Sequence, residues 1–270
     1  MTTDDAEKVT ARVATNYSAT ADGYAEFWSP VIRPLGRRLL EALPWDRAGR
    51  ILDVGTGTGT LLSDILSFSP TARVIGIDRS FGMLALARAT GARLPLVTMD
   101  AMALGIRTDT FDIAVLAFVL FHLPDPSAAL AEVKRTLRRR GTIGMTTWAE
   151  DPATPASQIW DEELSRCGAW DPSPQPPNHE LMNTPEKVGC LLKAAGFAPG
   201  RVWIERLEHQ WDLGPFMGLR THFGATKRQL DTLDARTRET LLARIEARML
   251  RLSSSDLVCR GAAICAVGAV

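Results

Sequence analysis

The chain has 270 residues, of which 46% are hydrophobic and 23% are charged, a composition that is ordinary for a folded globular protein. Its 31 Lys and Arg side chains balance 31 Asp and Glu side chains, so the net charge of zero excludes the strongly basic surface that nucleic acid or an anionic membrane attracts. This length allows one large α/β domain, or a domain with an insert, whose core needs no disulfide or metal ion for stability.

The first residues and the cysteines bear on where the protein works. The opening MTTDDAEK is acidic and polar, which is not typical of a signal peptide, and no run of about 18 apolar residues predicts a membrane span. The cysteines form no C-x-x-C pair and have no histidine at ligand spacing, so we expect reduced thiols, no metal site and a cytoplasmic location. These cysteines are Cys167, Cys190, Cys259 and Cys265.

Residues 1–44 precede the first predicted strand and favour two or three helices. Their apolar stripe runs from Ala19 to Ala42, and we expect Pro30 and Pro34 to break it into pieces. Aromatic side chains crowd this segment, where they either pack onto the core or cover an active site. The aromatic residues that could form such a lid are Tyr17, Tyr24, Phe27 and Trp28.

The stretch ILDVGTGTGTLL, residues 51–62, predicts a buried strand, a glycine turn and a helix. Glycines in such a turn let backbone N–H groups approach a ligand. A dinucleotide site of the form G-x-G-x-x-G needs a third small residue, but Thr60 or Leu62 stands there. Asp78 follows the second strand at about twenty residues' distance, where an acid can accept both hydroxyls of a ribose.

From Arg50 onward, apolar runs alternate between the strand and helix periods. Strands are expected at 51–54, 73–77, 96–99, 111–116 and 142–147, and helices at 61–67, 83–89 and 128–137. This alternation predicts a parallel sheet with crossover helices. We interpret the basic triplet Arg138–Arg140 as the solvated end of the third helix, where cations are favoured by the helix dipole.

The remainder of the chain begins with an insert rich in proline and tryptophan, residues 148–183. Thr184 and Pro185 predict the N-cap and first position of a helix that ends near Gly196. The other expected elements are a helix at 157–167, a strand at 202–207, a helix from Asp234 with Arg244, Arg248 and Arg251 on its outer face, and a last strand at 259–270.

The spacing G-x-G-x-G behind Asp53, with Asp78 and Asp100 closing the next two strands, resembles motif I and its partners in the class I (Rossmann-like) S-adenosylmethionine-dependent methyltransferases. Residues 111–148 (FDIAVLAFVLFHLPDPSAALAEVKRTLRRRGTIGMTTW) are similar to the corresponding part of small-molecule and ubiquinone-type members. The resemblance covers residues 50–148 well and 184–207 moderately.

This resemblance implies an α/β fold with a seven-stranded, mostly parallel sheet, an antiparallel last strand, helices on both faces and helical lid inserts. It implies a single domain over residues 1–270. The expected core spans about 45–148, 184–207 and 256–270, and the lid segments span about 1–44, 149–183 and 208–255.

The resemblance also implies a site for S-adenosylmethionine. In that family, acids corresponding to Asp53, Asp78 and Asp100 face the methionine end, the ribose and the adenine amino group. The expected cofactor-binding residues are Asp53, Gly55, Thr56, Gly57, Gly59, Asp78, Arg79, Met83, Asp100, Ala101, Met102, Ala117 and Phe118. The expected substrate and lid residues are Tyr17, Tyr24, Phe27, Trp28, Trp148, Phe216 and Met217.

A methyl sulfonium is already a strong electrophile, so a protein must place the acceptor in line, exclude water and, for many acceptors, remove a proton. His122 follows the fourth strand and is the first candidate for the base, because a histidine titrates near neutral pH. His179, His209 and His222 lie in or beside the lid segments and are further candidates, of which His222 is the best. Transfer by proximity alone, without a base, stays open.

The sequence therefore predicts an S-adenosylmethionine-dependent methyltransferase that acts at O, N or C of a small molecule, with a secondary metabolite as the favoured acceptor. One alternative is a ubiquinone/menaquinone-type C-methyltransferase. Others are a methyltransferase fold repurposed for cyclisation with the cofactor as a structural ligand, or a nucleotide-binding module or dehydrogenase. We expect no nucleic-acid partner, and a monomer and a homodimer both stay open.

Overall fold

The computed structural model describes residues 3–149, 153–173 and 178–270. Within these residues a seven-stranded sheet has the order β3-β2-β1-β4-β5-β7-β6. Its strands are β1 (Arg50–Val54), β2 (Arg73–Asp78), β3 (Leu96–Thr98), β4 (Phe111–Ala117), β5 (Leu137–Trp148), β6 (Ala198–Gln210) and β7 (Val258–Ala269). Strands β1 to β5 pair in parallel, and β7 is antiparallel to both β5 and β6. The predicted sheet with an antiparallel last strand is confirmed.

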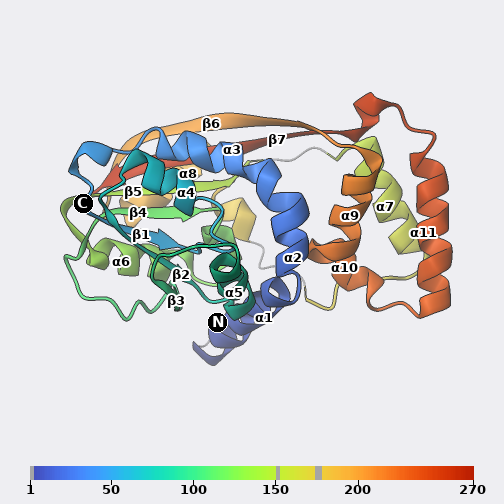
Figure 1. Cartoon of the computed structure of the whole chain (residues 1–270), viewed down its shortest axis with the longest axis horizontal. Coiled ribbons are helices and arrows are strands. Elements are labelled where there is room, and N and C mark those ends of the chain that lie inside the picture. Colours follow the sequence, from blue (N-terminus) through green and yellow to red (C-terminus); the bar gives the residue numbers. More distant parts are fainter. Residues whose placement is uncertain (1–2, 150–152, 174–177) are drawn as a thin grey trace.

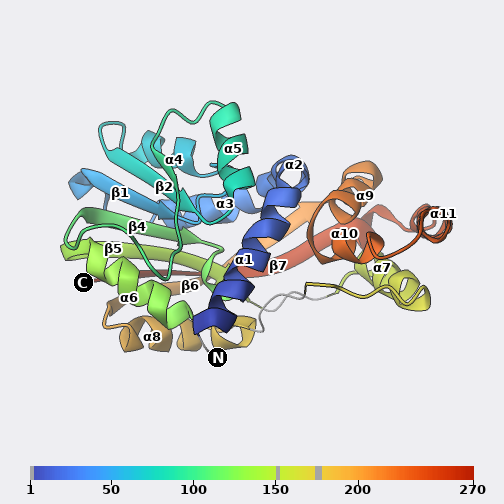
Figure 2. The same cartoon turned by 90° about the horizontal axis from the view of Figure 1, so that it is seen from below.

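Helices cover both faces of the sheet (Figure 2). One face packs against α3, α4 and α5, and the other against α6 and α8. The α-helices are α1 (Thr3–Ala19), α2 (Ala21–Gly23), α3 (Ser29–Leu40), α4 (Leu62–Phe68), α5 (Phe81–Ala89), α6 (Pro126–Thr136), α7 (Pro155–Arg166), α8 (Pro185–Ala194), α9 (Leu213–His222), α10 (Gly224–Leu230) and α11 (Ala235–Met249). The π-helix η1 (Tyr24–Trp28) and the 3₁₀ turns η2 (Trp45–Arg47), η3 (Leu120–His122), η4 (Asn178–Leu181) and η5 (Ser254–Leu257) complete the set.

The central strands are mostly apolar because both faces of the sheet are covered. Ile51, Leu52 and Val54 of β1 are fully buried, as are the residues of β4 from Ile113 to Leu116. The buried polar residues Asp53 of β1 and Thr146 and Thr147 of β5 lie near the carboxyl ends of their strands. Polar side chains that could bind a ligand therefore lie at the carboxyl edge of the sheet.

Strands β6 and β7 continue beyond the body of the sheet into a lobe built from α7, α9, α10 and α11 (Figure 1). A separate apolar cluster, with Trp160 and Ile245 at zero exposure, fills this lobe. Arg244 and Arg248, expected on the outer face of α11, both bind the carboxylate of Glu163 on α7, which is only 1% exposed. Both arginine side chains remain partly exposed, at 38% and 35%, and they also pair with this acid because a buried carboxylate needs partners.

Two local predictions are corrected. Arg138–Arg140 lie in β5 and not at the end of α6, because the sheet register skips from Phe111 to Ile113 and the arginines fill the irregular stretch opposite. Pro34 lies inside α3 and does not break it. Proline in a helix interior costs about 3 kcal/mol, and the buried apolar face of α3, on both sides of the proline, offsets that cost.

Among the described residues, none of the helices combines the length and the apolar character needed to cross a lipid bilayer.

Candidate functional site

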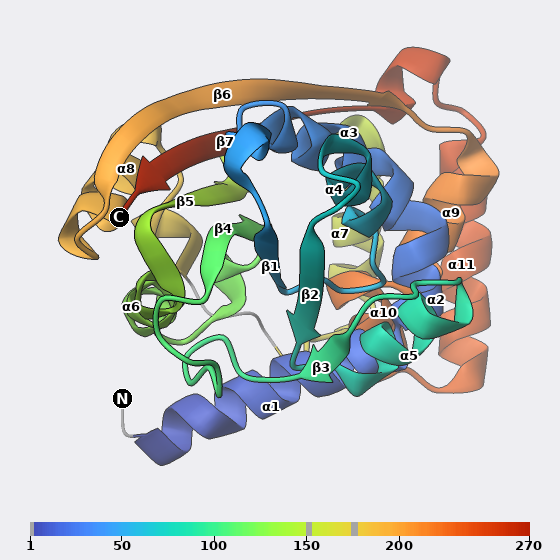
Figure 3. The same ribbon diagram turned by 60° about the vertical axis from the view of Figure 1, so that its left-hand side comes forward.

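A cavity of about 230 Å³ lies where the carboxyl ends of β1 to β5 meet the N-terminal helix α1. In Figure 3, α1 crosses the ends of β2 and β3. Ligands of open α/β sheets bind at this edge. The predicted site residues on the cavity wall are Tyr17, Tyr24, Trp28, Gly55, Gly57, Asp78, Arg79, Met83, Asp100, Ala101, Ala117, Phe118, His122 and Trp148.

The turn after β1 depends on glycine. Gly55 has φ of +70°, and a Cβ atom there would lie 2.3 Å from Cγ2 of Val119, so both conformation and space require a residue without a side chain. Gly57 has φ of +56° and also faces the cavity. Gly59, expected at the cofactor, lies off the cavity wall, where a Cβ would contact Leu62 and Ala87. The absence of a side chain at Gly59 therefore allows α4 and α5 to pack closely.

Asp78 joins the glycine turn to the cavity. Its Oδ2 accepts a hydrogen bond from the backbone N–H of Gly57 at 2.9 Å, and its Oδ1 accepts one from the N–H of Ser80 at 2.8 Å. Enclosure by the cavity walls raises the pKa of this carboxyl, although both hydrogen bonds oppose the rise. Asp78 thus holds the turn in place and presents a carboxylate to any ligand in the cavity.

Asp53 lies behind the same turn and is 3% exposed. Its Oδ2 accepts a hydrogen bond from Oγ1 of Thr56 at 2.6 Å, and burial raises its pKa to about 6. Both residues line a smaller hollow of about 30 Å³, which shares Gly55 and Phe118 with the main cavity. Neither residue lines the main cavity itself.

Asp100 follows β3 and is held from two sides. Nη1 of Arg79 donates a hydrogen bond to its Oδ2 at 2.6 Å, and the N–H of Met102 donates one to its Oδ1 at 2.8 Å. The same arginine also pairs with Glu7 on α1. Ala101 lines the cavity, whereas Met102, expected at the cofactor, does not. The acid at this strand end therefore also helps to fix α1 over the sheet.

His122 lies in η3, directly after β4. The hydroxyl of Tyr17 lies 2.9 Å from its Nε2, and the two rings meet edge to face at 5.2 Å between centroids. Burial raises the pKa of Tyr17 far above its ordinary range, so its phenol keeps its proton. His179 also lines the cavity, stacked on Phe121 at 4.4 Å, and burial lowers its pKa. An imidazole and a phenol are thus paired on the cavity wall.

Aromatic rings form the wall beside this pair. Trp148 contacts Phe118 at 4.6 Å and Trp28 at 5.9 Å between ring centroids. Phe118 has φ of +59°, a strained conformation for a residue with a side chain, of the kind that clusters at functional sites. Tyr24 and Trp28 stand at the two ends of the π-helix η1, and π-helical turns are likewise frequent at such sites.

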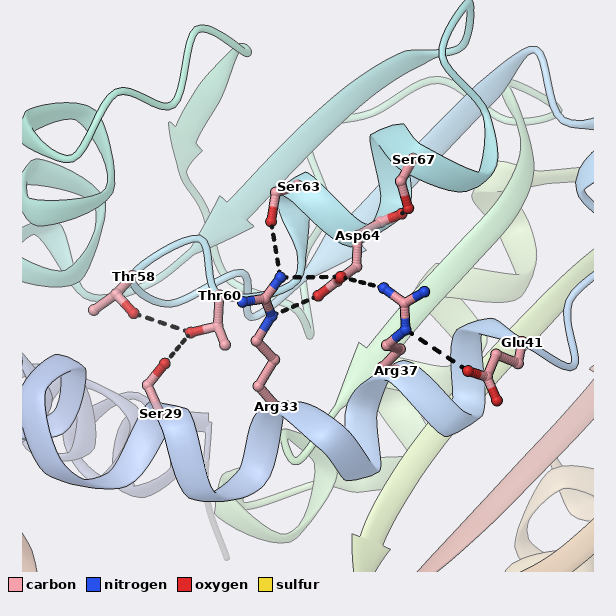
Figure 4. Close-up of polar contacts among 9 residues, drawn as sticks. All are labelled: Ser29, Arg33, Arg37, Glu41, Thr58, Thr60, Ser63, Asp64 and Ser67. Atoms are coloured by element: carbon pink, nitrogen blue, oxygen red, sulfur yellow. Dashed lines mark hydrogen bonds and ion pairs between the residues drawn. The ribbon is translucent and has the colours of Figure 1, made fainter.

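Helix α3, which follows η1, is fixed to the glycine turn and to α4 (Figure 4). Asp64 of α4, with 3% of its side chain exposed, accepts hydrogen bonds from Arg33 at 2.8 and 3.0 Å and from Arg37 at 2.8 Å. Oγ of Ser29 lies 2.7 Å from Oγ1 of Thr60. These contacts hold the start of α3, and with it the aromatic end of η1, against the turn after β1.

Four predicted residues lie in the contact between the lobe and η1 or deeper in the lobe. Phe27 packs against Gly218 and His222, and Nδ1 of that histidine hydrogen-bonds with the Gly218 carbonyl at 3.0 Å. Phe216 lines a separate pocket within the lobe, and Met217 packs in its apolar cluster. The structure does not bring these residues to the cavity, because Phe27 of η1 faces α9, and the three residues of α9 face η1 or the core of the lobe.

The sequence interpretation missed other residues of the wall, above all on α1. Thr10, Val13 and Ala14 line the cavity together with the predicted Tyr17. Their spacing of three and four residues is that of one helix face, a signal that was present in the sequence. The other missed wall residues are Ile32, Val54, Ile77, Ser80, Met99, Val119, Phe121 and Leu123, whereas His179 on the same wall was already a candidate base.

The residues at this edge fit S-adenosylmethionine. Two enclosed carboxylates with raised pKa values, Asp53 and Asp78, favour a ligand that brings positive charge and hydroxyl donors. At Gly57 a Cβ atom would meet nothing nearer than 4.0 Å, so a ligand can lie against the backbone there. Met83, Met99 and Ala101 would accommodate its apolar ring surface.

Comparison with known proteins agrees with this geometry. Residues 52–145 match the family described as "Methyltransferase domain". The chain is 35% identical over 131 residues to a ubiquinone/menaquinone biosynthesis C-methyltransferase of Geobacter sulfurreducens, covering 46% of this chain and 50% of that protein. It is 30% identical over 155 residues to a demethylmenaquinone methyltransferase of Streptomyces avermitilis, covering 57% of this chain and 65% of that protein. The chain thus spans less than two thirds of either relative.

Among solved structures, the [4+2]-cyclase SpnF is similar with a TM-score of 0.56 and 22% identity, over 90% of this chain and 82% of that one. This likeness concerns the fold. The match to the methyltransferase family and the relatives show that the chain carries, over residues 52–145, the domain of the class I (Rossmann-like), S-adenosylmethionine-dependent methyltransferases, and the sheet order agrees.

Proposed function

We propose that this protein transfers a methyl group from S-adenosylmethionine to O, N or C of a small-molecule acceptor, with a secondary metabolite as the favoured class. The observation that carries the proposal is a single cavity with two kinds of wall. The glycine turn, Asp78 and Asp100 line it at the ends of β1 to β3, whereas His122, Phe118 and Trp148 line it after β4 and β5.

S-adenosylmethionine, when bound, supplies a methyl group on a positively charged sulfur. Asp78 would hold its polar groups, Asp53 behind the turn would add negative charge, and the turn at Gly57 would let the cofactor lie against the backbone. The aromatic wall of Trp28, Phe118 and Trp148 would exclude water and hold an apolar acceptor. His122 would take the proton that an O or N acceptor gives up.

Calorimetric titration of the whole chain with S-adenosylmethionine, S-adenosylhomocysteine and NAD tests this proposal. We expect micromolar binding of the two sulfur compounds and none of NAD. Binding of NAD alone would replace the proposal with a dehydrogenase or nucleotide-binding module. Binding of neither sulfur compound would refute the cofactor assignment.

A ubiquinone/menaquinone-type C-methyltransferase is the second candidate, because the matched relatives from Geobacter and Streptomyces carry such names. Methyl transfer to a demethylated naphthoquinol with a short prenyl tail would support it. A cyclase that keeps the cofactor as a structural ligand is a third outcome, favoured only if the protein binds S-adenosylmethionine tightly and methylates no acceptor in a panel of planar phenols, amines and quinols.

We further propose that the whole chain acts as one unit, with its core at about 45–148, 184–207 and 256–270 and its lid segments at about 1–44, 149–183 and 208–255. The N-terminal segment supports this division, because α1 and η1 supply part of the cavity wall. The balanced charge supports a small molecule, not nucleic acid, as the partner. The cytoplasmic location stays a prediction, and monomer and homodimer both remain open.

A further inference from the structure

The last turn of α1 lies against the start of α5 at a distance that only glycine allows. A Cβ atom on Gly82 would lie 2.7 Å from the backbone oxygen of Ser18. The N–H of Gly82 donates a hydrogen bond to Oγ of Ser18 at 3.2 Å, and this Oγ lies 2.7 Å from Oγ of Ser80. The end of α1 is therefore placed by direct backbone contact with α5.

Tyr17 precedes Ser18 in α1 and lines the cavity, so the contact between α1 and α5 also sets the position of Tyr17. Its hydroxyl lies 2.9 Å from Nε2 of His122, and its ring packs against Tyr24 at 6.1 Å and Phe223 at 5.8 Å. Helix α1 and η3, more than a hundred residues apart in the chain, thus meet through one hydrogen bond at the cavity wall.

We propose that Tyr17 is a positioning residue for His122, and that the close packing of α1 on α5 decides whether it acts. This inference rests on the proposed function, because an oriented base matters only where the acceptor gives up a proton. Either the phenol donates to Nε2 or the Nε2–H donates to the phenol oxygen, and each arrangement selects one tautomer of the ring. The tautomer in turn fixes which nitrogen can accept a proton.

As a consequence, α1 covers the cavity and orients His122 at the same time. Helix α1 carries Glu7, which pairs with Arg79 beside the strand ends, and also carries Tyr17. A chain whose α1 is displaced would lose part of the cavity wall and the partner of His122 together. Misplacement of a catalytic group by about 1 Å costs roughly 10²-fold in rate, so the coupling would suppress proton removal until α1 is seated.

Nitrogen-15 NMR of the histidine rings tests the proposal on the full chain, with and without S-adenosylhomocysteine. The chain has four histidines, and a His122→Asn spectrum assigns the relevant signals. In Tyr17→Phe we expect the tautomer ratio of His122 to change by roughly two- to tenfold, the equilibrium equivalent of one hydrogen bond. Tyr24→Phe is the matched control, since Tyr24 shares the cavity wall and contacts Tyr17 only through the rings.

Gly82→Ala tests the second half of the proposal without altering either partner. Alanine is favoured over glycine within a helix, so the substitution acts through its contact with Ser18. We expect the His122 ratio to move in the same direction as in Tyr17→Phe, by a smaller amount.

An unchanged His122 signal in Tyr17→Phe would overturn the proposal, and so would an equal change in Tyr24→Phe. A response to Tyr17→Phe with none to Gly82→Ala would refute the role of the α1–α5 contact. These outcomes are separate from those of the proposed function. If the protein binds no S-adenosylhomocysteine, the methyltransferase proposal fails, while the spectrum of the free protein still decides whether Tyr17 positions His122.

Discussion

Replacing Asp78 with asparagine probes the centre of the proposed cofactor site. Asparagine keeps the size of the side chain and one acceptor oxygen. Its amide NH₂, however, would face one of the two backbone N–H groups from which the carboxylate accepts, so that hydrogen bond would be lost. Those donors are Gly57 at 2.9 Å and Ser80 at 2.8 Å. Alanine would leave both donors without a partner and disturb the turn more widely, so asparagine is the sharper substitution.

The expected loss follows from the number of hydrogen bonds to a charged group. One such bond contributes about 1.5–3 kcal/mol, so Asp78→Asn should lower the free energy of unfolding by about that amount. If the carboxylate also accepts from a ribose hydroxyl, the affinity for S-adenosylhomocysteine should fall by the same energy, roughly 10- to 150-fold in Kd.

Calorimetric titration and urea denaturation separate the two effects, and Asp112→Asn is the matched control. Asp112 also accepts from two backbone N–H groups, those of Gly49 at 2.9 Å and Arg50 at 2.8 Å, but it lies at the amino ends of β1 and β4. The Asp112→Asn protein should have a lower free energy of unfolding and an unchanged affinity for S-adenosylhomocysteine. An Asp78→Asn protein that loses stability but binds S-adenosylhomocysteine within twofold of the unaltered protein would show that Asp78 only shapes the turn.

Further predictions concern the turn, the base and the pH. Gly55→Ala should lower stability by about 1–3 kcal/mol through backbone strain and weaken binding of S-adenosylhomocysteine; adding Val119→Ala should restore part of the loss, and no recovery would mean that their contact is not the cause. His122→Ala should leave cofactor affinity unchanged and lower turnover about 10²- to 10⁴-fold; near-normal turnover would indicate transfer by proximity. Affinity for S-adenosylmethionine should rise as the pH rises through about 6, where Asp53 ionises, because only its charged form attracts a cationic ligand. Titrations across that range should show no such step in Asp53→Asn.

Two groups of arginines show what a local sequence pattern cannot predict. The basic triplet Arg138–Arg140 has the composition of a helix end, yet the register of β4 and β5 places it in an irregular strand. Arg244 and Arg248 have the spacing of a solvated helix face, yet Glu163 on another helix binds both. In each case the partner is distant in the chain, so no local pattern contains it.

The sequence by itself determined the order of strands and helices in the core. The apolar run from Ile51 to Val54 and the glycines after it predict a strand and a turn, and β1 and that turn lie where expected. Thr184 caps α8 as predicted, and Asp234, where the later helix was expected to start, caps α11; each accepts a hydrogen bond from the N–H three residues on. These features depend on contacts within one turn or on a repeating burial pattern, which the sequence contains directly.

Only the tertiary structure decided which of the surrounding aromatic and histidine residues reach the cavity. Tyr17, Trp28 and His122 lie on its wall, whereas Phe27 and His222 meet each other beside it. That outcome depends on where one helix approaches another closely enough to need a glycine, as at Gly23, Gly82 and Gly218. The sequence around a glycine does not indicate which distant residue will pack against it. The residues that line the site are therefore decided by packing between segments that are far apart in the chain.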